Sequence, residues 1–259
     1  MQDAYYGTLL REYHNIPFAK GCCTEIGTET VTFRLTNRDR TPDELSTFKI
    51  LGPGMIILKN YLSLKDQVDI VKLCDKMTFG LRGYYMYKSD VDCRRQMCFG
   101  RNWAPETRYK NRYMSNGMEP LPIPDELISL AEAAIQDAQI HLDELPSMRP
   151  DTCLANFYQS EGRLGLHQDD DESPDSLERG LPVVSISIGD MAEFVYGHTP
   201  DKKELKSVML KSGDVLIFGG KSRLIYHGVT QIYLYTSPEP LIEDSGLRPG
   251  RLSLTLRQF

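Results

Sequence analysis

The chain has 259 residues, of which 41% are hydrophobic and 25% are charged, and its formal net charge is −6. This composition is typical of a soluble globular protein with one large core, and no apolar run approaches the roughly 18 residues of a membrane span. The negative charge argues against a protein that binds nucleic acid over its whole surface.

Two features bear on where the protein works. Residues 1–6 lack the basic and apolar regions of a secretion signal. The six cysteines form no C-x-x-C pair, which favours reduced thiols. We therefore expect an intracellular monomer, in the nucleus, the cytoplasm or both, without a membrane partner.

The predicted elements follow one another in a simple order. Residues 1–47 are rich in turn formers and are expected to be an N-terminal extension. Helices are predicted at about 64–77, after a capping pair of Ser63 and Asp66, and at about 125–140. From Cys153 onward, short strands alternate with Gly, Asp and Ser turns. Helices before a run of short strands predict an α+β fold with a β-rich C-terminal half.

Residues 82–113 differ from the rest of the chain in charge. They hold eight basic residues against three acidic ones, so this segment carries +5 and the remainder −11. Seven aromatic residues are interleaved with these charges. Basic side chains neutralise phosphates and aromatic faces stack on unpaired bases, so the segment is a candidate nucleic-acid contact. A solvated loop with buried tyrosines would show the same composition.

A strand-like segment carries His167 and Asp169, and His227 follows 58 residues after that aspartate. Side chains alternate along a strand, so His167 and Asp169 are expected on one face. Two imidazoles and one carboxylate leave three positions of a ferrous ion open, the arrangement of non-haem iron oxygenases. The three residues are therefore candidate iron ligands and catalytic residues.

The last strand-like run carries Arg251 and Arg257, six positions apart, with Ser253 between them. Both arginines are expected on the same strand face. The planar guanidinium binds carboxylates bidentately, so two arginines that lean inward would hold the two ends of a small dicarboxylate. An iron with open positions needs a chelating co-substrate, and the arginine pair therefore predicts 2-oxoglutarate.

Several stretches of the C-terminal half carry recognisable motifs. They are residues 154–158, 164–172, 184–189, 213–228 and 251–258. Together they resemble the AlkB family of Fe(II)- and 2-oxoglutarate-dependent nucleic-acid dioxygenases, over about residues 121–259 with a looser correspondence near Trp103. The resemblance implies a dioxygenase domain over 48–259. It also implies a double-stranded β-helix (jelly roll) core, N-terminal helices, and a nucleotide-recognition lid over 82–113.

The resemblance assigns the co-substrate site residue by residue. It implies that 2-oxoglutarate and O2 join the Fe(II), and that five side chains hold 2-oxoglutarate: Asn156, Tyr158, Arg251, Ser253 and Arg257. Arg251 would hold the distal carboxylate, and Arg257 would lie near the metal-chelating end. Ser253 departs from the family, where asparagine is common, so weaker or rearranged binding is expected.

The resemblance also implies substrate contacts. Asp171 would meet the amino group of the methylated base, and Trp103 would stack on the base, although simple packing explains Trp103 equally well and Tyr109 competes for the role. Phosphate contacts are expected from three arginines: Arg94, Arg95 and Arg101. Asp170 and Glu172 are expected to be solvated, and Arg223 is expected to brace Asp169.

The function that follows is oxidative removal of N-methyl groups from nucleobases, in single-stranded nucleic acid or on a flipped base. DNA and RNA both remain open, as does the identity of the base. One alternative keeps the chemistry and makes the protein a hydroxylase of proteins or small molecules. Another is a catalytically silent nucleic-acid-binding module, which has no physical need for the full set of ligands and arginines.

Overall fold

The computed structural model describes residues 47–259, apart from residues 79–84, 89–92, 116 and 160–162. All described residues belong to one compact unit. The N-terminal extension expected over 1–47 lies outside the described residues, except for Thr47, where the first described strand begins.

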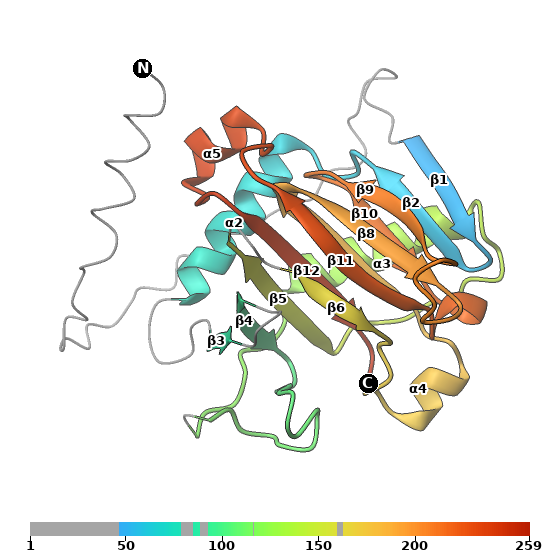
Figure 1. The fold of residues 1–259 in the computed structure, drawn as a ribbon. Coiled ribbons are helices and arrows are strands. Elements are labelled where there is room, and N and C mark those ends of the chain that lie inside the picture. The colour runs from blue at the N-terminus through green and yellow to red at the C-terminus, as the bar shows by residue number, and fades with distance from the viewer. Residues whose placement is uncertain (1–46, 79–84, 89–92, 116, 160–162) are drawn as a thin grey trace. The chain divides into compact units, whose positions relative to one another are not determined.

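Two antiparallel sheets form the core of the described unit (Figure 1). The large sheet has the order β1-β2-β10-β7-β12-β5-β4-β3, and the small sheet has the order β6-β11-β8-β9. The strands of the large sheet are β1 Thr47–Gly52, β2 Met55–Lys59, β3 Tyr85–Lys88, β4 Cys93–Phe99, β5 Thr152–Tyr158, β7 Val183–Gly189, β10 Val215–Phe218 and β12 Arg251–Arg257. The strands of the small sheet are β6 Leu164–His167, β8 Met191–Gly197, β9 Lys206–Leu210 and β11 Tyr226–Tyr233.

The described helices are α2 Leu64–Thr78, α3 Asp125–Gln139, α4 Pro174–Glu178, α5 Glu239–Ser245 and the 3-10 turn η2 Gly220–Ser222. The helices predicted at 64–77 and 125–140 are observed as α2 and α3. A reciprocal capping pair starts α2: the Ser63 hydroxyl accepts from the Asp66 amide at 3.1 Å, and the Asp66 carboxylate accepts from the Ser63 amide at 3.2 Å. None of the described helices is long and apolar enough to span a membrane.

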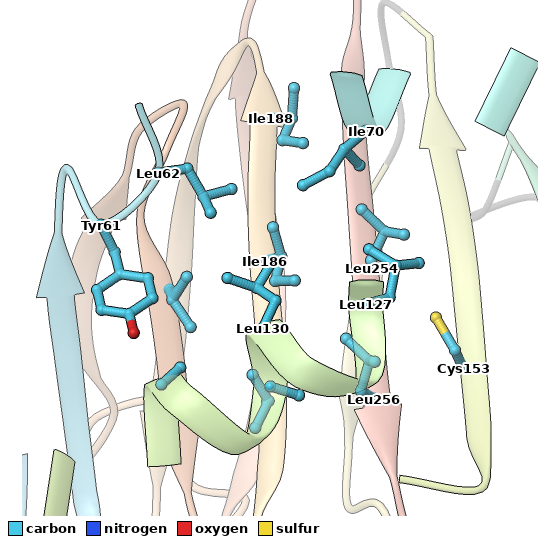
Figure 2. Close-up of a cluster of buried hydrophobic side chains, with 14 of the residues drawn as sticks. Tyr61, Leu62, Ile70, Leu127, Leu130, Cys153, Ile186, Ile188, Leu254 and Leu256 are labelled. Atoms are coloured by element: carbon cyan, nitrogen blue, oxygen red, sulfur yellow. The ribbon is translucent and has the colours of Figure 1, made fainter. Parts of the chain in front are cut away.

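One face of the large sheet packs against helices through alternating apolar residues. Leu252, Leu254 and Leu256 of β12 belong to the same buried cluster as Leu127 and Leu130 of α3. Figure 2 shows Leu127, Leu130, Leu254 and Leu256 filling the space between helix and sheet. Burial of each such leucine stabilises the fold by roughly 1.5–3 kcal/mol. The helices therefore cover this face and leave the opposite face of the sheet for the site.

The opposite face of the large sheet turns toward the small sheet. A second apolar cluster, which includes Leu216 and Phe218 of β10 and Phe194 of β8, joins the two sheets there. The alternate residues of β12, Arg251 and Arg257 among them, line a cavity on this face. Two antiparallel sheets with helices on one side agree with the predicted α+β class and with the layers of a jelly roll.

Candidate metal centre and cofactor pocket

His167, Asp169 and His227 come together between the two sheets, with one ligand atom of each within 4.8 Å of the others. The Nε2 atoms of both histidines lie 3.7 Å from the Asp169 carboxylate oxygens. The pairing of β11 with β6 places His227 directly opposite His167. Residues 60 positions apart in the chain therefore share one site because these strands are neighbours.

The second ring nitrogen of each histidine orients its imidazole. Nδ1 of His167 contacts the Gly165 carbonyl at 2.8 Å, and Nδ1 of His227 contacts the Ile225 carbonyl at 3.0 Å. A protonated Nδ1 in each ring leaves Nε2 with a free lone pair toward Asp169. Burial lowers the pKa of His227 to about 4, in spite of the nearby Asp169. This histidine is therefore neutral at physiological pH, as metal ligation requires.

Asp169 is held as a carboxylate by its surroundings. Burial alone would raise its pKa, but the charge of Arg257, with smaller contributions from the two histidines and Arg223, lowers it well below the ordinary range. Arg257 Nη2 lies 2.8 Å from the carboxylate oxygen Oδ1. The other oxygen, Oδ2, is buried and accepts no hydrogen bond from the described residues. It is therefore open to a cation.

The local geometry differs from the sequence prediction in one respect. His167 and Asp169 were expected on one strand face, but β6 ends at His167, and Asp169 lies in the segment beyond it. The two side chains converge because Arg223 fixes the backbone there, its Nη1 donating to the carbonyl of Asp169. Arg223 thus contacts Asp169 through the main-chain carbonyl of that residue.

A cavity of about 490 Å³ opens beside the three ligands. Its lining includes all five residues predicted to hold 2-oxoglutarate: Asn156, Tyr158, Arg251, Ser253 and Arg257. Register explains this convergence, because β12 pairs with β5 so that Ser253 faces Asn156 and Arg251 faces Tyr158. The two strands therefore present their polar residues to the same space.

Arg251 is a buried cation whose described hydrogen-bond partners are neutral. Only 1% of its surface is exposed, and its described hydrogen bonds go to the Ser187 hydroxyl at 2.8 Å and the Asp190 carbonyl at 3.5 Å. Burial lowers its pKa to about 10. No acid of the described residues forms a salt bridge with it. A buried guanidinium without a counter-ion is costly, so the site fits an incoming carboxylate.

Arg257 has a different environment from that of Arg251. It contacts Asp169 and, through Nη1 at 3.3 Å, also Glu172. Asn156 adds a buried side-chain oxygen without a described hydrogen-bond partner, and a half-turn of this amide would present its NH2 to a carboxylate. The donor set thus fits Fe(II) at the triad, and it fits 2-oxoglutarate with Arg251 as the main carboxylate contact.

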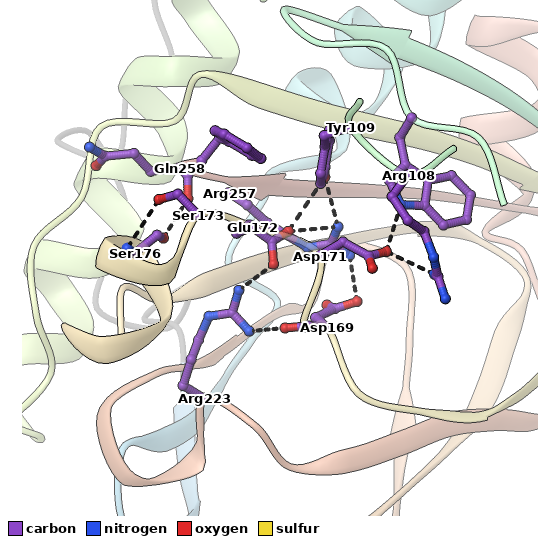
Figure 3. A network of polar contacts seen from close by, with 12 residues as sticks. Arg108, Tyr109, Asp169, Asp171, Glu172, Ser173, Ser176, Arg223, Arg257 and Gln258 are labelled. Carbon is purple, nitrogen blue, oxygen red and sulfur yellow. Dashed lines mark hydrogen bonds and ion pairs between the residues drawn. The ribbon is translucent and has the colours of Figure 1, made fainter. Parts of the chain in front are cut away.

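Glu172 corrects a sequence expectation, because its side chain is fully buried and not solvated. Figure 3 shows it between two arginines: Arg223 Nη2 lies 2.7 Å from one carboxylate oxygen and Arg257 Nη1 lies 3.3 Å from the other. With Asp169, these four residues form a buried network without net charge. The sequence signal was a run of four acids after His167, which requires nearby cations if it lies beside a buried site.

Replacing Glu172 with glutamine should lower stability by about 3–5 kcal/mol, because it leaves Arg223 as a buried cation without its carboxylate. For a domain of this size, we expect the melting temperature to fall by roughly 10 °C. Glu132→Gln is the matched control, because its pair with Arg149 at 3.0 Å is exposed and should contribute under about 1 kcal/mol. Equal melting temperatures for the two variants would show that the buried network contributes little.

Two residues predicted for the substrate, Trp103 and Asp171, lie in the lining of the cavity. Trp103 Nε1 donates to the Asp171 carboxylate at 2.8 Å, and both residues line the cavity. Arg108, which the sequence interpretation did not single out, also lines it and donates to the same oxygen at 2.9 Å. Its guanidinium lies 6.0 Å from the centre of the Trp103 ring. Asp171 thus holds an indole and a guanidinium together in the cavity lining.

Two of the three arginines predicted to contact phosphates, Arg95 and Arg101, do not line this cavity. Arg101 lies 3.4 Å from Asp151, and its guanidinium lies 4.3 Å from the centre of the Phe259 ring. Arg95 is half-buried on β4, where it pairs with Phe157. The side chain of Arg94 lies outside the described side chains. Phosphate contacts by these three residues stay predictions.

Comparison with known proteins agrees with this geometry. The family model described as "2OG-Fe(II) oxygenase superfamily" matches residues 54–257 of this chain. The DNA N(6)-methyladenine demethylase ALKBH1C of Arabidopsis thaliana is 46% identical over 224 residues, which are 81% of this chain and 49% of that protein. The alpha-ketoglutarate-dependent dioxygenase AlkB of Salmonella typhimurium is 42% identical over 236 residues, 85% of this chain and 97% of that protein. The solved structure of OsALKBH1 superposes with a TM-score of 0.78 at 44% identity, covering 82% of this chain and all of that one.

The fold and site define an enzyme class that uses Fe(II), 2-oxoglutarate and O2. The chain belongs to the 2OG-Fe(II) oxygenase superfamily and, within it, to the AlkB family. It spans about half the length of the Arabidopsis demethylases that it matches.

Proposed function

We propose that this chain catalyses oxidative N-demethylation of a nucleobase, with N6-methyladenine in DNA as the first substrate to test. The observation that carries the proposal is the shared cavity. Its lining holds the metal triad and Arg251 together with Trp103 and Asp171. The similarity to proteins named DNA N(6)-methyladenine demethylase supports the choice of base.

In this proposal, each part of the cavity has one task. Arg251 holds the far carboxylate of 2-oxoglutarate, and Arg257 maintains Asp169 as a carboxylate. Bound Fe(II) with 2-oxoglutarate and O2 supplies the oxidation: one oxygen atom enters the N-methyl C–H bond and the other enters succinate, with loss of CO2. The hydroxymethyl group then leaves as formaldehyde. Trp103 stacks on the base, and Asp171 accepts a hydrogen bond from its amino group.

A wider substrate range belongs to the same proposal. The same chemistry fits RNA, 1-methyladenine and 3-methylcytosine. The contacts proposed for Trp103 and Asp171 are with the base and not with the sugar, so they do not select DNA over RNA. A base that is already unpaired should be preferred, since flipping from a duplex costs a few kcal/mol. We propose that the protein acts as a monomer inside the cell, where methylated DNA and RNA lie.

Mass spectrometry of methylated oligonucleotides tests the proposal. Matched DNA and RNA strands that carry each of the three bases are incubated with Fe(II) and 2-oxoglutarate. We expect loss of 14 mass units per methyl group removed, together with formaldehyde and succinate, and no loss when iron is chelated. Turnover of 2-oxoglutarate without demethylation of any strand would favour the hydroxylase of proteins or small molecules instead.

The lid, taken as residues 82–113, enters the proposal as the phosphate-binding surface. Its exposed arginines with described side chains are Arg101, Arg108 and Arg112, with 43%, 53% and 73% of the side chain exposed. Changing all three to glutamine should weaken single-stranded oligonucleotide binding and flatten its salt dependence. Each lost phosphate contact lowers the slope of log affinity against log salt by about 0.7.

The control for the lid variant changes two arginines elsewhere, Arg149 and Arg179, whose side chains are 67% and 55% exposed. Binding titrations at several salt concentrations should give this control the slope of the parent protein. The same slope in the lid variant would remove the lid from the nucleic-acid surface.

A further inference from the structure

The loop that follows β4, here called the entrance loop (residues 100–115), is tied to the segment that carries the metal carboxylate. Trp103 and Arg108 bind Asp171, as described above, and Tyr109 binds one residue further along. Its hydroxyl donates to Glu172 Oε1 at 3.4 Å and accepts from Arg257 Nη1 at 3.2 Å. The entrance loop and the metal site therefore share hydrogen-bonded contacts (Figure 3).

Tyr109 differs from Trp103 and Arg108 because one of its partners, Arg257, also contacts the metal carboxylate of Asp169. Arg257 contacts Tyr109 through Nη1 and Asp169 through Nη2, at 3.2 Å and 2.8 Å. Only one guanidinium thus separates the loop from the metal carboxylate. Phe259 packs edge-on against the tyrosine ring, with centroids 5.4 Å apart, and restricts where the hydroxyl can lie. Burial raises the pKa of Tyr109 to about 12, so the phenol stays a donor at physiological pH.

We propose that Tyr109 is a positioning residue that ties the entrance loop to the metal site through Arg257 and Glu172. The role of the loop in substrate binding rests on the proposed function, but the connection itself does not. The Arg257 guanidinium contacts Asp169 through Nη2 and contacts Glu172 and Tyr109 through Nη1. A metal ion on Asp169 neutralises that carboxylate, so Arg257 bonds more strongly to its remaining partners. Filling the metal site therefore holds the loop in place.

Hydrogen–deuterium exchange of the full chain tests this connection, with Mn(II) alone as the probe metal. In the parent protein, Mn(II) should slow exchange of the amides in residues 100–115 by about threefold or more. Tyr109→Phe removes the hydroxyl and keeps the ring, and should lose more than half of this protection.

Tyr113→Phe is the matched control, because this tyrosine lies on the same loop, is 53% exposed and does not line the cavity beside the metal site. It should keep the protection of the parent. Melting temperatures establish that each variant is folded, and calorimetric titration of Mn(II) establishes that the metal still binds. Full protection in Tyr109→Phe, or no protection by Mn(II) in the parent, would overturn the proposal. Because no nucleic acid and no turnover are involved, this result is independent of whether demethylation occurs.

Discussion

Replacing His167 with alanine should abolish high-affinity metal binding while the fold is kept. The variant leaves one imidazole and one carboxylate, too few to hold a ferrous ion against water. We expect affinity to fall by more than the 10–100-fold that loss of a hydrogen-bonding partner of a ligand typically costs. Oxidation of 2-oxoglutarate should fall with it. Calorimetric titration with Mn(II) and assays of succinate measure the two effects separately.

Stability should change little in this variant, because the His167 side chain is 35% exposed and its hydrogen bond goes to a carbonyl two residues away. A melting temperature within a few degrees of the parent would confirm this. His198→Ala is the control, since this exposed histidine does not line the cavity. Parental turnover in His167→Ala would show that the iron ligands are assigned wrongly.

The parts of the site that could be predicted lie on short strands, where successive side chains alternate between the two faces of the sheet. On β12, Arg251, Ser253 and Arg257 line one cavity because a strand repeats every two residues. Asn156 and Tyr158 of β5 follow the same rule. The helices α2 and α3 were predictable for a similar reason, since apolar residues recur there at helical spacing.

The parts that could not be predicted depend on contacts between distant segments. Glu172 and Arg223 are 51 residues apart, and Tyr109 and Arg257 are 148 apart. Local pattern assigns Glu172 to an acidic, solvated run, and only the tertiary fold shows the two arginines around it. The contacts of Arg257 with Asp169, Glu172 and Tyr109 could not be predicted for the same reason.

Replacing Arg251 with methionine should weaken 2-oxoglutarate binding by about 100-fold or more and leave the ligand-free protein nearly as stable as the parent. Two charge-assisted hydrogen bonds to a carboxylate contribute about 1.5–3 kcal/mol each, and methionine offers none. Stability changes little because two effects offset each other. A buried cation without an acid is removed, but the Ser187 hydroxyl loses its partner.

Thermal unfolding in the presence of Mn(II) separates these effects. At 2-oxoglutarate concentrations 100 times the parental Kd, binding stabilises the parent by about 2.7 kcal/mol, whereas a 100-fold weaker variant gains only about 0.4 kcal/mol. The shift in melting temperature should therefore almost disappear. A full shift in Arg251→Met would mean that the co-substrate does not use this arginine.

The same substitution at Arg257 gives the contrast that makes the interpretation of Arg251 specific. Arg251 is the first residue of β12 and Arg257 is the last. Both are buried, with 1% of the surface of Arg251 and 7% of that of Arg257 exposed. Arg257→Met, however, leaves Asp169 and Glu172 as buried carboxylates that lose a cation. We expect a loss of about 3–5 kcal/mol before any ligand is added. Unfolding of the two ligand-free variants measures this difference in stability directly. Similar free energies of unfolding would show that the contacts of Arg257 with Asp169 and Glu172 do not stabilise the protein.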